Sequence, residues 1–355
     1  MSKRTAISRQ KNIMIHLIAG VLGLIACALV IVSLTKQNPI QVYAGIIDGA
    51  VGNPRRIWVT IRETMILLLI AVGLTPAFKM RFWNIGAEGQ VLIGGMTTAA
   101  LMIYCGDKLP TAVVFVLMLV CSTAAGMIWG LIPAFFKAKY NTNETLFTLM
   151  MNYVAMQIIT FAICFWENPK GSNTVGIINK TSHGGWFPSI GGNEYILNVI
   201  IVMILTSLMY YYLKKSKQGF EIAVVGSSQN TARYAGISVR RVILRTMMIS
   251  GAICGLAGAL IVGGSSHTIS TSTANGRGFT AIIVAWMAKF NPFIMIIISA
   301  LLVFMQQGAI QIASQFGLNK NASDIITGII LFFLIGSEFF VNYKLEFRKK
   351  ETEAA

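Results

Sequence analysis

The sequence predicts an all-α, polytopic integral membrane protein with about ten transmembrane helices and with both termini in the cytoplasm. Three observations predict this fold class. Of the 355 residues, 55% are apolar and only 12% are charged, whereas soluble domains carry about 25% charged residues. The apolar residues gather in ten runs, and Lys and Arg are shared unequally among the segments between these runs. This composition argues against a soluble enzyme and against intrinsic disorder.

The first apolar run, Ile13 to Leu34, follows a short basic segment with four Lys and Arg residues. A secretory signal peptide has a shorter apolar core, of about 7–15 residues, and a small-residue cleavage site. A run of 22 residues is long enough to cross a bilayer. We therefore expect an uncleaved first span.

Nine further candidate spans follow along the chain. They are Met65–Phe78, Asn84–Tyr104, Thr111–Phe136, Thr145–Trp166, Tyr195–Leu213, Val242–Gly263, Gly278–Ala288, Phe293–Ala313 and Ile325–Val341. Met65–Phe78 and Gly278–Ala288 are short for a full crossing. The first of these has Arg62 and Glu63 at its outer end and Pro76 inside it. Short or interrupted spans are typical of backbone that lines a cavity within a transporter. We predict one membrane domain over residues 1–355.

The basic residues test the number and the direction of the spans. Ten crossings place both termini on the same side, and if that side is the cytoplasm, cytoplasmic segments hold 19 of the 29 Lys and Arg residues against eight outside. Cytoplasmic loops of membrane proteins carry such an excess. Nine or eleven crossings would put the basic C-terminus outside. The distribution favours an N-in, C-in protein, and the net charge of +16 then orients the chain rather than marking a nucleic-acid binder.

Two loops differ from the others. Residues 167–194 are polar, rich in Gly, Ser and Asn, and predicted to be extracytoplasmic. Residues 214–241 hold six Lys and Arg residues, are predicted to be cytoplasmic, and are expected to form a short helical element. The charge of this second loop is explained equally by the orientation of the chain or by a docking surface for a cytosolic partner.

Catalytic, cofactor-binding and metal-binding motifs are absent from the sequence. The five cysteines form no C-x-x-C pair, and the three histidines, His16, His183 and His267, are scattered. There is no H-E-x-x-H, no G-x-S-x-G and no phosphate-binding G-x-x-x-x-G-K-[ST] motif. The chain is therefore predicted to be no enzyme and to hold no cofactor, and any ATP dependence must come from another subunit. An ion-coupled secondary transporter that uses Glu88 is the alternative, because such carriers need ionisable groups inside the membrane.

A few polar residues lie within the apolar runs and are candidates for a translocation pathway. They are Asn84, Glu88, Gln90, Asn152, Gln307 and Gln311. Polar groups are expensive in lipid and should face protein or a cavity, so each could line a route for solute or hold helices together. Asn143 and Glu144 are better explained by helix capping. Trp286 and Phe290 could stack on a solute ring or belong to an interfacial aromatic belt.

Five segments together resemble a known family. They are RETMILLLIAVGLTPAFKMRFWNIGAEGQ (62–90), NETLFTLMMNYVA (143–155), VGSSQNTARYAGISVRR (225–241), SGAICGLAGAL (250–260) and GRGFTAIIVAW…NP (276–292). In this order they resemble the membrane permeases of bacterial ABC importers for branched-chain amino acids, simple sugars and nucleosides. The similarity covers residues 57–341, and NIGAEGQ followed by NETLFTLMMNY is closest to the nucleoside permeases.

The resemblance implies a multi-pass permease subunit of the bacterial cytoplasmic membrane that passes a nucleoside, or a related solute such as a simple sugar, inward. Such a subunit pairs with a second permease subunit as a hetero- or homodimer. Cytosolic ABC ATPases, which bind ATP and Mg, drive the pair, and an extracytoplasmic solute-binding lipoprotein feeds it. No nucleic-acid partner is implied.

The resemblance also implies that the 214–241 loop couples the permease to the ATPase. Gly226, Tyr234, Gly236 and Ile237 stand at the coupling-motif positions of the family. Residues 223–229 depart from the R-A-V-G-x-N-P pattern that is common there, since they lack its Arg and Asn. Ala288 stands where a Gly is usual.

Overall fold

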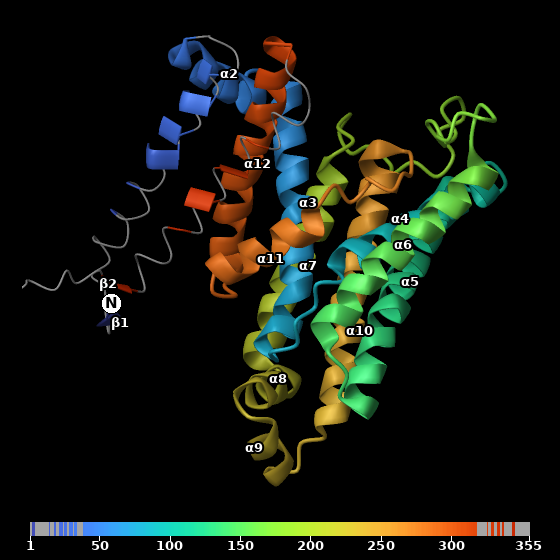
Figure 1. Cartoon of the computed structure of the whole chain (residues 1–355). Helices are drawn as coiled ribbons and strands as arrows, with labels where there is room; N and C mark the ends of the chain where they lie inside the picture. Colours follow the sequence, from blue (N-terminus) through green and yellow to red (C-terminus); the bar gives the residue numbers. More distant parts are fainter. Residues whose placement is uncertain are drawn as a thin grey trace, which may run out of the picture. The chain divides into compact units, whose positions relative to one another are not determined.

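The structure is a computed structural model that describes residues 38–317 without a break, together with Ser2, Lys3 and scattered positions in 14–33 and 325–344. The chain divides into two compact units: unit 1 comprises Met1–Thr60 and Leu301–Ala355, and unit 2 comprises Ile61–Ala300. The described part is helical (Figure 1) apart from two two-residue strands. Strand β1 (Ser2–Lys3) pairs antiparallel with β2 (Tyr343–Lys344) in unit 1.

Unit 1 contains α2 (Pro39–Val51), the first residues of α3 (Pro54–Lys79) and the C-terminal part of α12 (Pro292–Gln315). Helix α2 begins with Pro39, and the Asn38 side chain accepts a hydrogen bond from the Ile40 N–H, which is the expected chemistry of a helix N-terminus. The helix packs on α12, where Gly49 lies against Gly308 and Gln311. This helix was not predicted. The predicted spans 13–34 and 325–341 are described only at scattered positions.

Unit 2 contains the rest of α3 and of α12 and the other helices between residues 61 and 300. These are α4 (Ala87–Cys105), α5 (Thr111–Tyr140), α6 (Glu144–Trp166), α7 (Ile196–Lys215), α8 (Lys217–Ser227), α9 (Gln229–Tyr234), α10 (Val239–Ile261), a π-helical turn η1 (Val262–Ser266) and α11 (Arg277–Met287). The predicted short helical element at 214–241 is thus α8 and α9.

Six helices in the described residues are long and apolar enough to cross a membrane: α3, α5, α6, α7, α10 with η1, and α12. The all-helical class of a multi-pass membrane protein is confirmed, while the total of about ten spans and the N-in, C-in orientation stay predictions. Helix α11 has 11 residues and is as short as the sequence predicted.

Helix α3 corrects one prediction. The sequence assigned only 65–78 to a short span, but the helix runs over 26 residues, from Pro54 to Lys79. Arg62 and Glu63 lie inside it and form an ion pair with each other. Paired charges cost much less in an apolar surrounding than isolated ones, and so they do not end the helix.

Helix α10 is the centre of unit 2 and packs closely on α4 and α5. A Cβ atom on Gly126 of α5 would overlap the backbone of α10 at Gly251 and Gly255, and one on Gly255 would overlap α5. Small residues at a four-residue spacing allow helices in membranes to approach this closely. The SGAICGLAGAL segment is therefore a packing surface.

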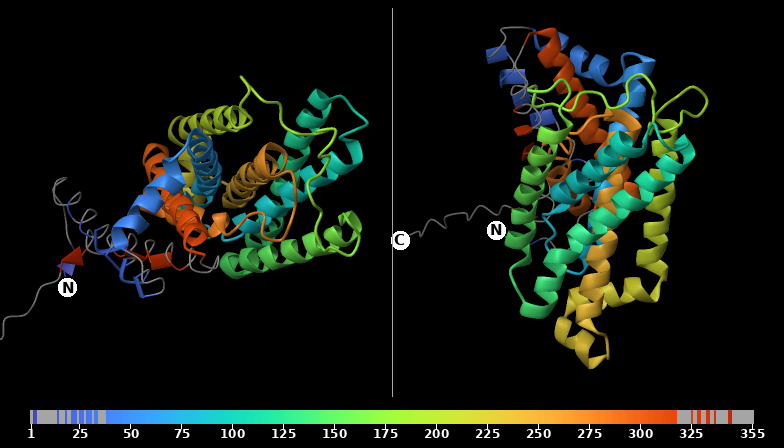
Figure 2. Two further views of the ribbon diagram at one scale, coloured as in Figure 1. Left: turned by 90° about the horizontal axis from the view of Figure 1, so that it is seen from above. Right: turned by 90° about the vertical axis from the view of Figure 1, so that its right-hand side faces the viewer.

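The two distinctive loops lie at opposite ends of the unit 2 helices. Helices α8 and α9 lie at one end, and the 167–194 loop, which joins α6 to α7, lies at the other (Figures 1 and 2). Opposite ends of a membrane-spanning bundle face opposite sides of the membrane, as the sequence predicts for these two loops.

Candidate functional site

The turn between α3 and α4 carries the first group of predicted pathway residues and is held by α6. The Asn152 side chain accepts a hydrogen bond from the Gly89 N–H (2.8 Å) and donates one to the Ile85 carbonyl (2.9 Å). One helical turn away, the Thr148 hydroxyl accepts from the Ile85 N–H (3.2 Å). Both side chains are buried. Asn152 therefore fastens the start of α4 to α6.

Asn84 and Gln90 form a second buried polar group. Their side-chain amides face each other at 3.4–3.5 Å, and the Asn84 amide also donates to the Ser250 hydroxyl on α10 (3.2 Å). The Asn84 side-chain oxygen, Oδ1, accepts a hydrogen bond from the Gly86 N–H (3.0 Å). Side-chain amides thus join the turn, α4 and α10 in the interior of unit 2.

Glu88 lies at the N-terminus of α11. Its two carboxylate oxygens accept hydrogen bonds from the backbone N–H groups of Gly276 and Gly278, each at 2.7 Å. The N-terminus of a helix carries unpaired N–H groups and the positive end of the helix dipole, so a carboxylate stabilises it. Gly276, with φ of 71°, begins the helix, and a Cβ on Gly278 would overlap the Glu88 backbone.

A chain of charged residues continues from this point. The Arg277 guanidinium binds Glu63 on α3 and donates to the Thr273 carbonyl. Glu63 also binds Arg62, whose guanidinium lies over the Tyr195 ring at 5.2 Å from its centre. Sequence reasoning missed this network. The sequence did contain a signal for this network. Arg62 and Glu63 lie beside an apolar run, and Arg277 lies directly before a short predicted span.

The remaining predicted pathway residues, Gln307 and Gln311, belong to unit 1. They lie on α12, and Gln311 packs against Gly49 of α2. The structure therefore brings Asn84, Glu88, Gln90 and Asn152 together around the start of α4. The two glutamines of α12 belong to unit 1 and not to this group. That these six residues line a pathway stays a prediction.

Helices α8 and α9 form a rigidly attached element. Ile222, Val225 and Ala232 are buried in an apolar cluster with residues of α3, α5 and α10, and Glu221 forms an ion pair with Arg245 of α10 (2.9 Å). The Ser228 hydroxyl accepts from the Thr231 N–H and separates the two helices. These contacts attach the element to the helices beneath it.

The four predicted coupling residues divide into two groups. Gly226 and Ile237 lie in the packing: a Cβ on Gly226 would overlap the Lys79 carbonyl, and Ile237 contacts the apolar cluster. Tyr234 is 93% exposed. Gly236 has φ of 74°, and nothing lies within 4 Å of the position a Cβ would take. Only Tyr234 and Gly236 are therefore free to meet a partner.

A cavity of about 710 Å³ lies beside this exposed tip, and Lys137, Lys139, Arg233 and Arg240 are among the residues that line it. Lys137 is paired with Glu144 (2.8 Å) at the start of α6, where Asn143 caps the helix, as predicted. The surface around Tyr234 and Gly236 is thus basic, which suits an acidic partner surface.

Trp286 and Phe290 are not isolated interfacial residues. Trp286 stacks on Trp83 with ring centres 5.4 Å apart, and Phe78 and Phe290 pack against the pair. Both tryptophans remain about half exposed. Within the described residues, no group of three or more His, Cys, Asp and Glu side chains could hold a metal ion.

These features define the chain as a helical, multi-pass membrane protein with a rigid surface element at one end. Comparison with known proteins then identifies its family. Residues 57–335 match the model of the permease component of branched-chain amino acid transport systems, and the chain belongs to this family. Homologous members are transport permease subunits.

Three relatives show what kind of permease this chain is similar to. The guanosine ABC transporter permease protein NupP of Bacillus subtilis is 29% identical over 97% of this chain and 99% of its own length. The nucleoside ABC transporter permease protein NupB of Lactococcus lactis is 28% identical over 92% of each chain. The glucose ABC transporter permease protein TsgB13 of Haloferax volcanii is 28% identical over 79% of this chain and 76% of its own. No solved structure matches the chain.

Proposed function

We propose that this chain is the permease subunit of an ABC importer that passes a nucleoside inward across the bacterial cytoplasmic membrane. The observation that carries the proposal is the full-length similarity to NupP and NupB, whose names specify guanosine and nucleosides. A simple sugar is the second solute class, because TsgB13 is named a glucose permease. The proposal includes about ten spans with both termini in the cytoplasm.

The partners follow from the same proposal. A second permease subunit completes the membrane pore, a cytosolic ATPase binds ATP and Mg, and an extracytoplasmic lipoprotein delivers the solute. The exposed, basic tip of α8 and α9 supports the ATPase contact, because a coupling element must be both exposed and rigidly attached if closure of the ATPase is to move the spans.

The test is uptake of radiolabelled guanosine by right-side-out membrane vesicles that contain the chain with its partner subunits and are loaded with ATP. We expect uptake that needs ATP and stops when the ATPase is inactivated by mutation, with glucose competing weakly or not at all. Uptake of guanosine by this chain reconstituted alone, without ATP, would refute the proposal and favour an ion-coupled carrier. Competition by glucose but not by guanosine would reassign the solute class.

A further inference from the structure

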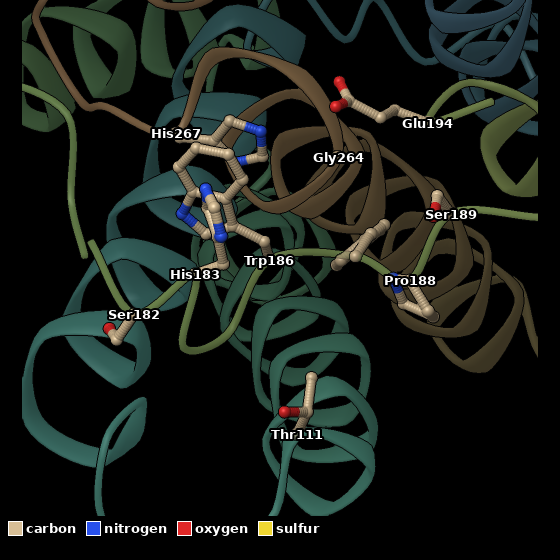
Figure 3. A pocket seen from close by; sticks show the side chains of 10 residues that line it. Thr111, Ser182, His183, Trp186, Pro188, Ser189, Glu194, Gly264 and His267 are labelled. Carbon is tan, nitrogen blue, oxygen red and sulfur yellow. The ribbon is translucent and has the colours of Figure 1, made fainter. Parts of the chain in front are cut away.

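The 167–194 loop covers the end of α10 and lines an open cavity of about 370 Å³ (Figure 3). The side chains that line it include Ser182, His183, Trp186, Ser189, Glu194 and His267. Sites for small ligands have volumes of about 300–1,000 Å³ and combine apolar walls with a few convergent polar groups. This cavity has a volume within that range and a mainly polar lining with one aromatic wall, and it has no role in the function proposed above.

The walls of the cavity are held in place by backbone hydrogen bonds. The Ile178 N–H donates to the His267 carbonyl (2.8 Å), and the Phe187 N–H donates to the Gly263 carbonyl of η1 (3.0 Å). The Trp186 indole N–H donates to the Ile178 carbonyl (2.9 Å). The loop is therefore built onto the end of α10, and the cavity is preformed.

An aromatic wall closes one side. The Trp186 ring lies parallel to the His267 ring, with centres 3.7 Å apart, and His183 packs edge-on against the same indole at 4.3 Å (Figure 3). Burial, together with the nearby charges of His183 and Arg62, lowers the pKa of His267 to about 4. His267 is therefore a neutral ring at physiological pH.

Two buried polar atoms at this wall have no hydrogen-bond partner among the described residues: His267 Nδ1 and Asn198 Oδ1. Asn198 lies directly behind Gly264, which lines the cavity, since a Cβ on Gly264 would be 2.6 Å from Asn198 Oδ1. Buried polar groups are nearly always paired, and an unpaired one requires an explanation.

The charge of the cavity limits the ligand. Glu194 is the one Asp, Glu, Lys or Arg side chain among the residues that line it. A carboxylate accepts hydrogen bonds from sugar hydroxyls, as acidic residues do from the ribose of dinucleotides. The same carboxylate repels phosphate.

We propose that this cavity is a binding site for an uncharged nucleoside, with the ribose hydroxyls on Glu194 and the base at the Trp186–His267 wall. The inference rests on the proposed function, since it places the first contact of the solute with the permease in the extracytoplasmic loop. It adds that the phosphorylated forms of the same solutes are rejected at this point.

The first experiment replaces Glu194 with Gln in the complete transport complex, and Glu167→Gln on the same loop is the matched control. Loss of hydrogen bonds to a charged group typically weakens binding by about tenfold or more. We expect the KM for guanosine uptake to rise by about tenfold in Glu194→Gln and to stay unchanged in Glu167→Gln. An unchanged KM in Glu194→Gln overturns the proposal.

The second experiment measures binding without transport. In a background whose five native cysteines are replaced by Ser or Ala, Ser189→Cys places a thiol in the cavity, and Lys170→Cys places one on the same loop outside it. Millimolar guanosine should slow the reaction of Ser189→Cys with a membrane-impermeant maleimide several-fold, whereas guanosine 5′-monophosphate should not, and Lys170→Cys should react equally under all conditions. Equal rates with and without guanosine overturn the proposal.

The outcomes separate this inference from the function on which it rests. If the wild-type complex takes up guanosine but neither variant behaves as expected, the cavity is not a solute site and the proposed function stands. If Glu194→Gln raises the KM without any protection of Ser189→Cys, the cavity contacts the solute-binding protein and the proposal is again overturned. If the wild-type complex takes up no nucleoside, the proposed function itself fails.

Discussion

Two buried polar side chains of unit 2 pair with backbone atoms of other elements. Asn152 reaches two backbone groups of the turn before α4, and Glu88 reaches two at the start of α11. The sequence indicated that these residues must face protein or a cavity because lipid excludes them. It could not specify the partners, because the residues that pair with Glu88 are about 190 positions away.

The pairing of Asn152 predicts the effect of its removal. Asn152→Leu leaves the Ile85 carbonyl and the Gly89 N–H without partners, at a cost of about 1–3 kcal/mol for each buried group. We expect a clear fall in the thermal stability of the purified protein. Gln157→Leu removes an exposed amide from the same helix and should have little effect. Changed solute affinity at normal stability and abundance would instead make Asn152 part of the pathway.

Glu88 tests the alternative of ion coupling. Glu88→Gln keeps one acceptor for the α11 N-terminus but loses the charge and the second hydrogen bond, so we expect lower thermal stability by about 1.5–3 kcal/mol. Glu144→Gln, at the N-terminus of α6, should cost less because that ion pair is partly exposed. ATP-dependent uptake should persist in both variants with an unchanged dependence on external pH. A proton-coupled carrier would instead lose transport in Glu88→Gln.

His267 predicts a pH dependence of stability. Its pKa is about 4 in the folded chain and 6.5 for an ordinary histidine, so the unfolded state takes up the proton first as the pH falls. The contribution of His267 to stability is therefore complete above about pH 6.5 and is lost progressively as the pH falls toward 4. The apparent unfolding temperature should decrease over this window, and His267→Phe should decrease less. Equal slopes in the two proteins would contradict this assignment.

At the scale of the helix, the sequence was most informative where an apolar run was uninterrupted. The span predicted at Thr145–Trp166 corresponds to α6, with Asn143 as its cap, as expected. Helix α3 was predicted too short because hydropathy treats Arg62 and Glu63 as isolated charges, while the structure pairs both, Glu63 also with Arg277 from α11. Helix α2 was overlooked although Asn38-Pro39 is a recognisable helix start.

The coupling element allows a matched pair of substitutions. Any side chain at Gly236 meets the same backbone strain, because φ is 74°, but only a large one extends into the space that a partner would occupy. Gly236→Trp should abolish association with the ATPase and ATP-dependent uptake. Gly236→Ala should retain most of both. Co-purification of the ATPase with the tagged permease measures the first effect, and normal association with Gly236→Trp would refute the assignment.

For the whole molecule, the distribution of the basic residues and the positions of the two loops agree on how the chain is oriented in the membrane. The 167–194 loop and the α8–α9 element lie at opposite ends of the unit 2 helices (Figure 2), and 19 of 29 Lys and Arg residues fall in segments assigned to the cytoplasm. The sequence predicted the sides from charge alone. It could not predict the cavity at His267, because that site exists only once the loop has folded onto η1.

Cysteine labelling measures this orientation directly. In a background whose five native cysteines are replaced by Ser or Ala, we expect an impermeant maleimide added to intact cells to label Lys170→Cys. Tyr234→Cys, at the exposed tip of α9, should react only after the membrane is permeabilised. The reverse pattern would place both loops on the wrong sides, and labelling of both from outside would contradict the single crossing, α7, that separates them.

The contact between α5 and α10 has a mechanical consequence. Where glycine backbones touch, no side chain lies between the helices that could change rotamer when one of them shifts. The two helices are therefore packed directly against each other. Helix α10 with η1 spans 28 residues, about 42 Å at 1.5 Å per residue, from the base of the α9 tip to the wall of the His267 cavity. The α9 tip and the wall of the cavity therefore lie at the two ends of one helical segment.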